Sequence, residues 1–195
     1  MAKIAVNIAL IPPDVVLDLA ITVNQSLKCA NQAVFLNKET CLPHITLAIG
    51  VMDSEKITEL AIRLVGLADQ FPAVEIIQNG IETSEVAAGV HFQKTANLQG
   101  LHEAVMNIVE QYFDYEATAD MFLTPPPVDL FPITFIKEFG LAKTHAGYDP
   151  HLTFGLGTFT KTPPDFNFTA ARLAVCHLGT YCTCRKILFE TTLIG

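Results

Sequence analysis

One eight-residue pattern occurs twice in this chain. Residues 43–50 read PHITLAIG and residues 150–157 read PHLTFGLG. Each copy is Pro-His-x-Thr, three mostly apolar residues and Gly, and the two histidines are 107 positions apart (151 minus 44). Polar and apolar residues alternate at the start of each copy, which is typical of a strand. One matched strand in each half of the chain predicts a fold made of two related lobes.

The strand period decides which side chains of the pattern lie together. Residues i and i+2 of a strand point to the same face. His44 therefore shares a face with Thr46, and His151 shares one with Thr153. The other residues of these faces are small, so we expect them to form the floor of a ligand site: Ala48 and Gly50 in the first copy, Gly155 and Gly157 in the second.

Two such strands side by side about a pseudo-twofold axis would bring two imidazoles and two hydroxyls to one cleft. Histidines suit acid–base work near neutral pH, because one ring can accept a proton while the other donates one. Threonine hydroxyls can donate hydrogen bonds to phosphate oxygens, which helps most where charge develops in the transition state. In-line displacement at phosphorus needs a base on one side and an acid on the other, and this pair supplies both without a metal.

The paired motifs resemble those of the 2H phosphoesterase superfamily, which includes 2′,3′-cyclic nucleotide phosphodiesterases and the bacterial 2′-5′ RNA ligase-like (LigT-like) proteins. The resemblance covers the whole chain in layout. It implies a bilobal α+β fold in which two antiparallel sheets, related by a pseudo-twofold axis, form a central cleft with helices packed outside. We expect one domain over residues 1–195. The resemblance also implies that His44 and His151 are the acid–base pair and that Thr46 and Thr153 are phosphate ligands.

The expected activity is hydrolysis of a cyclic phosphate or a related nucleotide or RNA-end phosphodiester, with no metal and no cofactor. The chain departs from the family pattern at one point. Many LigT-like members carry a basic residue just after the second motif, whereas Phe154 to Gly157 follow here. Lys143, before the motif, and Lys161, after it, are the candidates for a cation that meets the phosphate. The absence of a basic residue after the second motif favours hydrolysis of a small cyclic phosphate over RNA ligation or RNA-end binding.

Charge and composition limit the partners. The chain has 12 basic and 20 acidic residues, a net charge of −8, and no run of Lys or Arg. Proteins that hold long nucleic acid usually show a basic stripe, so a small ligand fits better. No run of about 18 apolar residues is present, so we expect no contact with a membrane. Five cysteines, an odd number, are typical of reduced thiols in a cytoplasmic protein.

Several residues keep two interpretations. Tyr148 could stack on a base or ribose, or simply anchor a turn. His145, Asp149 and His151 could form a two-histidine, one-carboxylate metal set, which would make the protein a metal-dependent hydrolase. A non-catalytic module that binds a nucleotide or an RNA end is the other alternative. His102 is predicted to lie on a solvated helix face.

The remaining pattern predicts the elements that carry these residues. We expect helices over about 12–31, 53–70 and 97–113, with a short helix near 133–139. The Pro-rich segment 124–132 could be a lid over the cleft or a static crossover between lobes. Besides the two motifs, strands are expected over residues 3–11, 73–83 and 86–94, and two more between 170 and 194.

Overall fold

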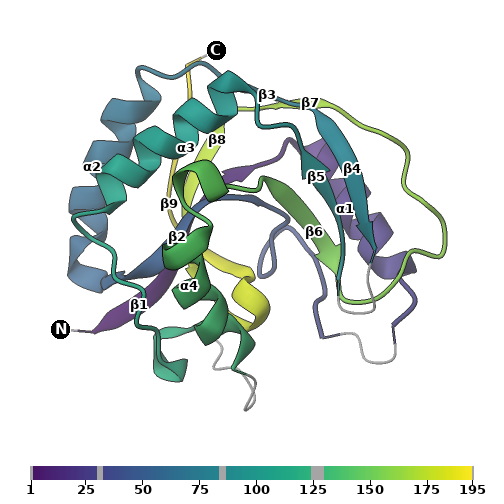
Figure 1. Ribbon diagram of the computed structural model, residues 1–195, viewed down its shortest axis with the longest axis horizontal. Coiled ribbons are helices and arrows are strands. Elements are labelled where there is room, and N and C mark those ends of the chain that lie inside the picture. The colour runs from purple at the N-terminus through teal and green to yellow at the C-terminus, as the bar shows by residue number, and fades with distance from the viewer. Residues whose placement is uncertain (1, 30–32, 84–86, 124–129, 195) are drawn as a thin grey trace.

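The computed structural model describes residues 2–29, 33–83, 87–123 and 130–194, and it has the α+β architecture expected (Figure 1). The named strands pair antiparallel in three sheets. The largest has the order β2-β1-β8-β9, with β1 at Lys3–Ile11, β2 at Ile45–Asp53, β8 at Arg172–Leu178 and β9 at Cys184–Thr192. A second sheet has the order β4-β5-β6, with β4 at Gln78–Thr83, β5 at Ala88–Phe92 and β6 at His151–Gly155. A small third sheet pairs β3, Val74–Ile76, with β7, Phe168–Ala170.

Four α-helices are found in the described residues, and they cover the sheets. They are α1 (Asp14–Ser26), α2 (Ile57–Ala68), α3 (Ala96–Val109) and α4 (Phe131–Ala142). Helices α2 and α3 pack on the four-stranded sheet, and α1 packs against the three-stranded sheet beside β6 (Figure 1). Helix α4 contacts β2 and the turn between β8 and β9. Short 3-10 turns occupy Ser54–Lys56, Ala119–Met121, His145–Gly147 and Thr180–Cys182.

The two lobes are not the two halves of the sequence. Strand β1 lies between β2 and β8, so the larger sheet joins the first two strands of the chain to the last two. The chain leaves this sheet after β2, builds the β4-β5-β6 sheet, and returns. Each lobe nevertheless carries one copy of the repeated motif, in β2 and in β6.

The buried strands explain why this topology is stable. β1 reads as a nearly continuous apolar run, and its residues from Ala5 to Ile11 are all buried. A strand buried on both faces needs this composition, because it is covered by neighbours on every side. β9 lies at the sheet edge, and all of its residues after Cys184 are half-buried or exposed, as expected for a less covered strand. One large apolar cluster extends through both lobes.

Most predicted elements are found, with shifts at their ends. α1 ends at Ser26 rather than near residue 31, α4 runs from Phe131 to Ala142 rather than over 133–139, and the strand expected over 73–83 is divided into β3 and β4. The β3–β7 pairing was not predicted. The turn expected near residue 84 and residues 124–129 of the Pro-rich segment lie outside the described residues. All five cysteines are free thiols.

The helices in the described parts of the chain are all too short or too polar to span a bilayer.

Candidate active site

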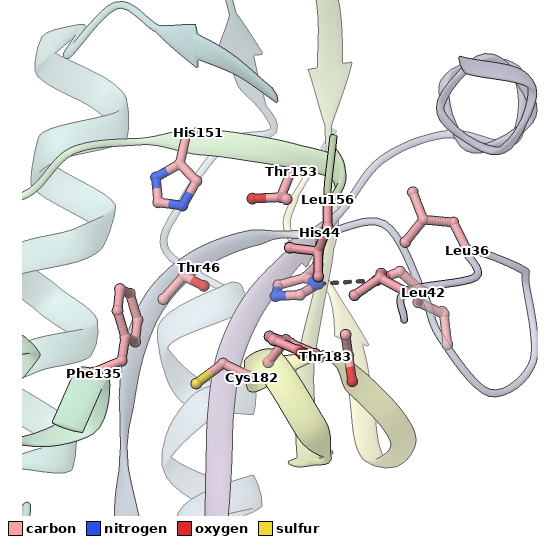
Figure 2. A pocket seen from close by; sticks show the side chains of 12 residues that line it. Leu36, Leu42, His44, Thr46, Phe135, His151, Thr153, Leu156, Cys182 and Thr183 are labelled. Atoms are coloured by element: carbon pink, nitrogen blue, oxygen red, sulfur yellow. Dashed lines mark hydrogen bonds between the residues drawn. The ribbon is translucent and has the colours of Figure 1, made fainter. Parts of the chain in front are cut away.

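The two motif strands bring their polar side chains to one cavity. β2 and β6 belong to different sheets but approach each other in the middle of the molecule. His44 and Thr46 from the first motif, and His151 and Thr153 from the second, line a cavity of about 130 Å³ (Figure 2). The four residues chosen from sequence are therefore neighbours in space.

Both imidazoles are held in the same way. Nδ1 of His44 lies 2.9 Å from the carbonyl oxygen of Leu42, and Nδ1 of His151 lies 2.8 Å from that of Asp149. In each case the carbonyl belongs to the residue two positions earlier. Because a carbonyl oxygen can only accept, Nδ1 carries the hydrogen in both rings. Nε2 is then the nitrogen of each ring that can take or give a proton in the cavity.

The surroundings of His44 favour its uncharged form. Burial lowers the pKa of His44 below its ordinary value, because a charged ring loses its water there. The hydrogen bond to Leu42 opposes this shift, and charge on His151 adds to it. In the uncharged form that this shift favours, Nδ1 carries the hydrogen and Nε2 has a free lone pair.

The two threonines differ in what holds them. Thr46 is half-buried, and its Oγ1 accepts a hydrogen bond of 2.7 Å from Nδ2 of Asn7, on β1. Thr153 is exposed. Sequence reasoning missed Asn7, although a signal was present: it is the one polar residue between Ala5 and Ile11 of an otherwise apolar strand.

Mostly apolar side chains form the rest of the cavity, together with the polar Thr183. Cys182 belongs to this wall, and burial raises the pKa of its thiol, so it lines the cavity uncharged. Tyr181 and Cys182 both have left-handed backbone conformations, with φ of 57° and 55°, in the turn between β8 and β9. Such strained positions are often found at functional sites. The apolar lining also includes Val34, Leu36, Leu42, Phe135 and Leu156 (Figure 2).

Comparison by sequence finds no matching family model and no matching curated protein. Solved structures do match. Two are E. coli LigT complexed with phosphate (TM-score 0.57, 13% identity) and with ATP (TM-score 0.60, 14% identity), each covering 100% of both chains. TT0787 of Thermus thermophilus matches with a TM-score of 0.59 and 12% identity, over 98% of this chain and 99% of that one.

The chain has the LigT-like fold. This confirms, at the level of the fold, the resemblance to 2H phosphoesterases drawn from the two motifs.

The small residues of the two motifs do not form the floor of the cavity, as we had expected. In β2 the pairing register shifts between Ala48, opposite Ile8, and Thr46, opposite Ala9. In β6 it shifts in the same way just after Thr153. A bulge breaks the alternation of side chains, so residues beyond it change face. The floor predicted from strict alternation is therefore wrong in both copies.

Those small residues instead allow the chain's own segments to pack closely. A Cβ on Gly50 would lie 2.5 Å from the ring of Phe113. A Cβ on Gly155, which has a φ of +152°, would lie 2.6 Å from Nδ2 of Asn24 in α1. The glycines thus admit a helix and a neighbouring ring rather than a ligand.

The two candidate cations differ in position. Lys143 lines a smaller hollow together with Thr46, Asp149 and His151, and its Nζ lies 5.4 Å from the centre of the Phe135 ring. It is therefore beside the motif residues. Lys161 is exposed and is not among the described residues that line either cavity.

Tyr148 is buried in the protein rather than free to receive a substrate ring. It is 1% exposed, and its ring stacks on that of His102 with 4.0 Å between centroids and 3° between planes. The ring of Tyr148 is therefore not available to stack on a base or ribose, and its position agrees with the alternative, that it anchors the turn. Its hydroxyl has no hydrogen-bond partner within the described parts of the chain.

His102 is fully buried, so its predicted place on a solvated helix face is wrong. Its Nδ1 donates to the carbonyl of Leu47 at 2.7 Å, and its Nε2 accepts from the backbone N–H of His145 at 2.9 Å. The helix pattern gave no sign of this, because both partners come from distant parts of the chain. His102 connects α3 to β2 and to the loop before the second motif.

The residues of the suggested metal set are not brought together. The side chain of His145 pairs with Glu103, while Asp149 contacts Nδ1 of His91 at 3.2 Å. Over residues 2–29, 33–83, 87–123 and 130–194, no three His, Cys, Asp or Glu side chains are arranged to hold a metal ion.

His91 lies directly opposite His151 in the β5–β6 pair, with 6.0 Å between ring centres.

Proposed function

We propose that the protein is a metal-independent phosphodiesterase that hydrolyses a cyclic phosphate, or a related nucleotide or RNA-end phosphodiester, by two-histidine acid–base catalysis. One observation carries the proposal. Both imidazoles have Nδ1 bound to the carbonyl two residues earlier, so two Nε2 atoms and two threonine hydroxyls are available to one cavity. Neither packing nor simple binding needs two titrating groups held in matched orientations.

The lowered pKa of His44 suggests the roles of the two rings. Neutral His44 acts as the general base: its Nε2 takes a proton from water as the water oxygen attacks phosphorus. The P–O bond to the leaving sugar oxygen breaks, and that oxygen takes a proton from Nε2 of His151, which enters the step with a hydrogen on both ring nitrogens and leaves it neutral. Thr46 and Thr153 donate hydrogen bonds to the non-bridging oxygens, where negative charge increases in the transition state. Lys143 supplies positive charge from the adjoining hollow.

The lining supports a small, singly charged substrate. The described residues that line the main cavity include no Lys or Arg, and the net charge of the chain is −8. A cyclic phosphodiester carries one negative charge, whereas a phosphate monoester carries close to two at neutral pH. The apolar wall would receive the organic part of the substrate. A nucleoside as this organic part is supported by E. coli LigT, which has been solved with 3′-AMP and with ATP.

Free thiols support a reducing compartment, and we infer a cytoplasmic location from them.

The test is turnover of a panel of 2′,3′-cyclic nucleotides in excess EDTA. Wild type is compared with His44→Ala, His151→Ala and the double variant, and His177→Gln, whose imidazole contacts the backbone at Met121, is the control histidine outside the cavity. We expect each alanine variant to lose about a hundredfold to ten-thousandfold in rate, with the control close to wild type. The position of the phosphate on the product would show which ester bond breaks.

Three other outcomes would contradict the proposal or favour an alternative function. Wild-type rates in His44→Ala or His151→Ala would refute the two-histidine mechanism. Loss of turnover in EDTA would point to a metal-dependent hydrolase. Tight binding of 3′-AMP by a wild type that turns nothing over would favour the non-catalytic binding module.

A further inference from the structure

We propose that Asn7 is a positioning residue that fixes the hydroxyl of Thr46, so that its proton is directed at the substrate phosphate. The inference rests on the proposed function, because it assigns a role within the same site. Asn7 lies on β1 and belongs to neither motif.

The register of the sheet places Asn7 beside Thr46. The shift after Thr46 puts this residue opposite Ala9, whereas an unbroken register from the Ile8–Ala48 pair would put it opposite Leu10. Residues opposite each other share a face, and so do residues i and i+2 of one strand. Thr46, Ala9 and Asn7 therefore lie on one face, with Asn7 as the diagonal neighbour of Thr46. The bulge is what turns the threonine toward the amide.

The hydrogen bond between them sets the direction of the hydroxyl. Nδ2 of Asn7 donates to Oγ1 of Thr46 at 2.7 Å. A hydroxyl has one hydrogen, and an oxygen that accepts from the amide keeps that hydrogen for another partner. Asn7 is 0% exposed in the middle of the sheet, so its amide has little freedom to move. Thr46 is then a donor oriented before the substrate arrives, which is the property that favours transition-state stabilisation.

The amide is an unfavourable choice for the strand itself. Oδ1 of Asn7 is buried and has no hydrogen-bond partner in the described parts of the chain. Burying an unpaired acceptor destabilises a protein, and an apolar side chain would fill β1 without this cost. The benefit of the amide therefore falls on Thr46, which accepts its hydrogen bond. Thr153 is exposed, so the two threonines are not equivalent.

A double-mutant cycle tests the coupling. Asn7→Leu, which is neutral and of similar size, is made in wild type, in Thr46→Val and in Thr153→Val. In wild type we expect kcat on a 2′,3′-cyclic nucleotide to fall about fivefold to twentyfold, less than the hundredfold or more expected when a donor itself is removed. KM should change less than kcat, because the oriented donor acts most strongly where the charge on the phosphate oxygens is greatest, as it is in the transition state.

The two threonine backgrounds separate positioning from a general effect on folding. In Thr46→Val the change Asn7→Leu should cost no further rate, because no hydroxyl remains to be oriented. In Thr153→Val, the matched control, the full loss should remain. Equal losses in all three backgrounds would overturn the inference.

A second variant should show a pH dependence of the rate that a purely structural role of Asn7 would not produce. Asn7→Asp keeps the size of the side chain, and its ionised carboxylate can only accept, so it draws the hydroxyl hydrogen of Thr46 away from the phosphate. Its protonated form can donate as the amide does. The rate of Asn7→Asp relative to wild type should therefore recover as the pH is lowered, and a constant ratio would contradict the proposal. This variant also serves if Asn7→Leu does not fold.

Inorganic phosphate separates failure of this inference from failure of the proposed function. Its affinity is measured by calorimetry for the same set of variants. If wild type turns over no cyclic nucleotide but Asn7→Leu weakens phosphate binding only where Thr46 is present, the function fails and the positioning role stands. If turnover is seen without coupling, the function stands and the positioning role fails. Absence of both turnover and phosphate binding overturns both.

Discussion

At the level of single residues, the two histidines are held alike but lie in different surroundings. The same bond from Nδ1 to a backbone carbonyl fixes both rings. For His44, however, loss of water on burial lowers the pKa of the ring. The motif alone could not distinguish them, because the difference comes from residues that pack around the cavity from other elements.

The burial of His44 has a consequence for the pH dependence of turnover. If neutral His44 is the base, kcat/KM falls at low pH as the free enzyme takes up a proton there. Because the pKa of His44 is lowered from 6.5, the midpoint of this acidic limb should lie below pH 6.5. The measurement is a pH–rate profile with a cyclic nucleotide whose own charge is constant over the range. A midpoint at or above pH 6.5 would assign the base role elsewhere.

Single residues were predictable where their chemistry repeats in the sequence. The pairs His44–Thr46 and His151–Thr153 could be chosen because two copies of one pattern are improbable as ordinary strand residues. Asn7 could not be assigned a role, because its partner depends on which strands pair and in what register. The sequence left two interpretations of Tyr148 open for a similar reason, because the ring that stacks on it, His102, is on a distant helix.

At the level of elements, helix α3 does more than cover a sheet. Through His102 it contacts the carbonyl of Leu47, next to Thr46, and the backbone N–H of His145, before the second motif. The same ring stacks on Tyr148. One buried imidazole therefore joins the segments that carry both halves of the candidate site.

Replacing this imidazole should affect stability and its dependence on pH. Burial lowers the pKa of His102, so the unfolded chain takes up a proton more readily than the folded one. The stabilisation is present above the ordinary pKa of 6.5 and is lost as the pH falls below it. We expect His102→Gln to destabilise the protein by about 1–3 kcal/mol at pH 7.5. Its melting temperature should also fall less than that of wild type between pH 7.5 and pH 5, and an unchanged pH dependence would contradict this account.

Elements were predictable from local patterns, whereas their contacts were not. Apolar runs and helical spacing predicted most helices and strands to within a few residues. The bulges after Thr46 and Thr153 could not be read in this way, because a bulge is a relation between two strands. The predicted floor failed for that reason, since it assumed an alternation that the pairing breaks.

At the level of the whole molecule, the net negative charge favours a small ligand over a long nucleic acid. The chain carries a net charge of −8, and Lys143 is the cation found beside the motif residues. The α+β fold followed from the resemblance carried by the two motifs, whereas the third, two-stranded sheet was not expected. The pairing of β1 with β8 did not, because strands from opposite ends of a chain leave no shared signal in one sequence.

This charge predicts an unusual response to salt. An anionic protein repels an anionic substrate at long range, and added salt screens that repulsion. We expect kcat/KM for a cyclic nucleotide to stay constant or rise between about 20 and 200 mM salt. A protein that binds a nucleic-acid backbone through Lys and Arg instead loses affinity steeply over such a range. A steep fall in kcat/KM would therefore indicate a polymer substrate.

The place of β1 between β2 and β8 also bears on how the chain is made. Ile11 pairs with Arg172, 161 positions later (172 minus 11), so one edge of the first strand stays open while most of the polypeptide is synthesised. An open, apolar strand edge invites pairing with other chains. We therefore expect the nascent chain to expose an apolar edge of β1 until Arg172–Leu178 has left the ribosome, which makes that edge the part of the chain most open to pairing with another copy during synthesis.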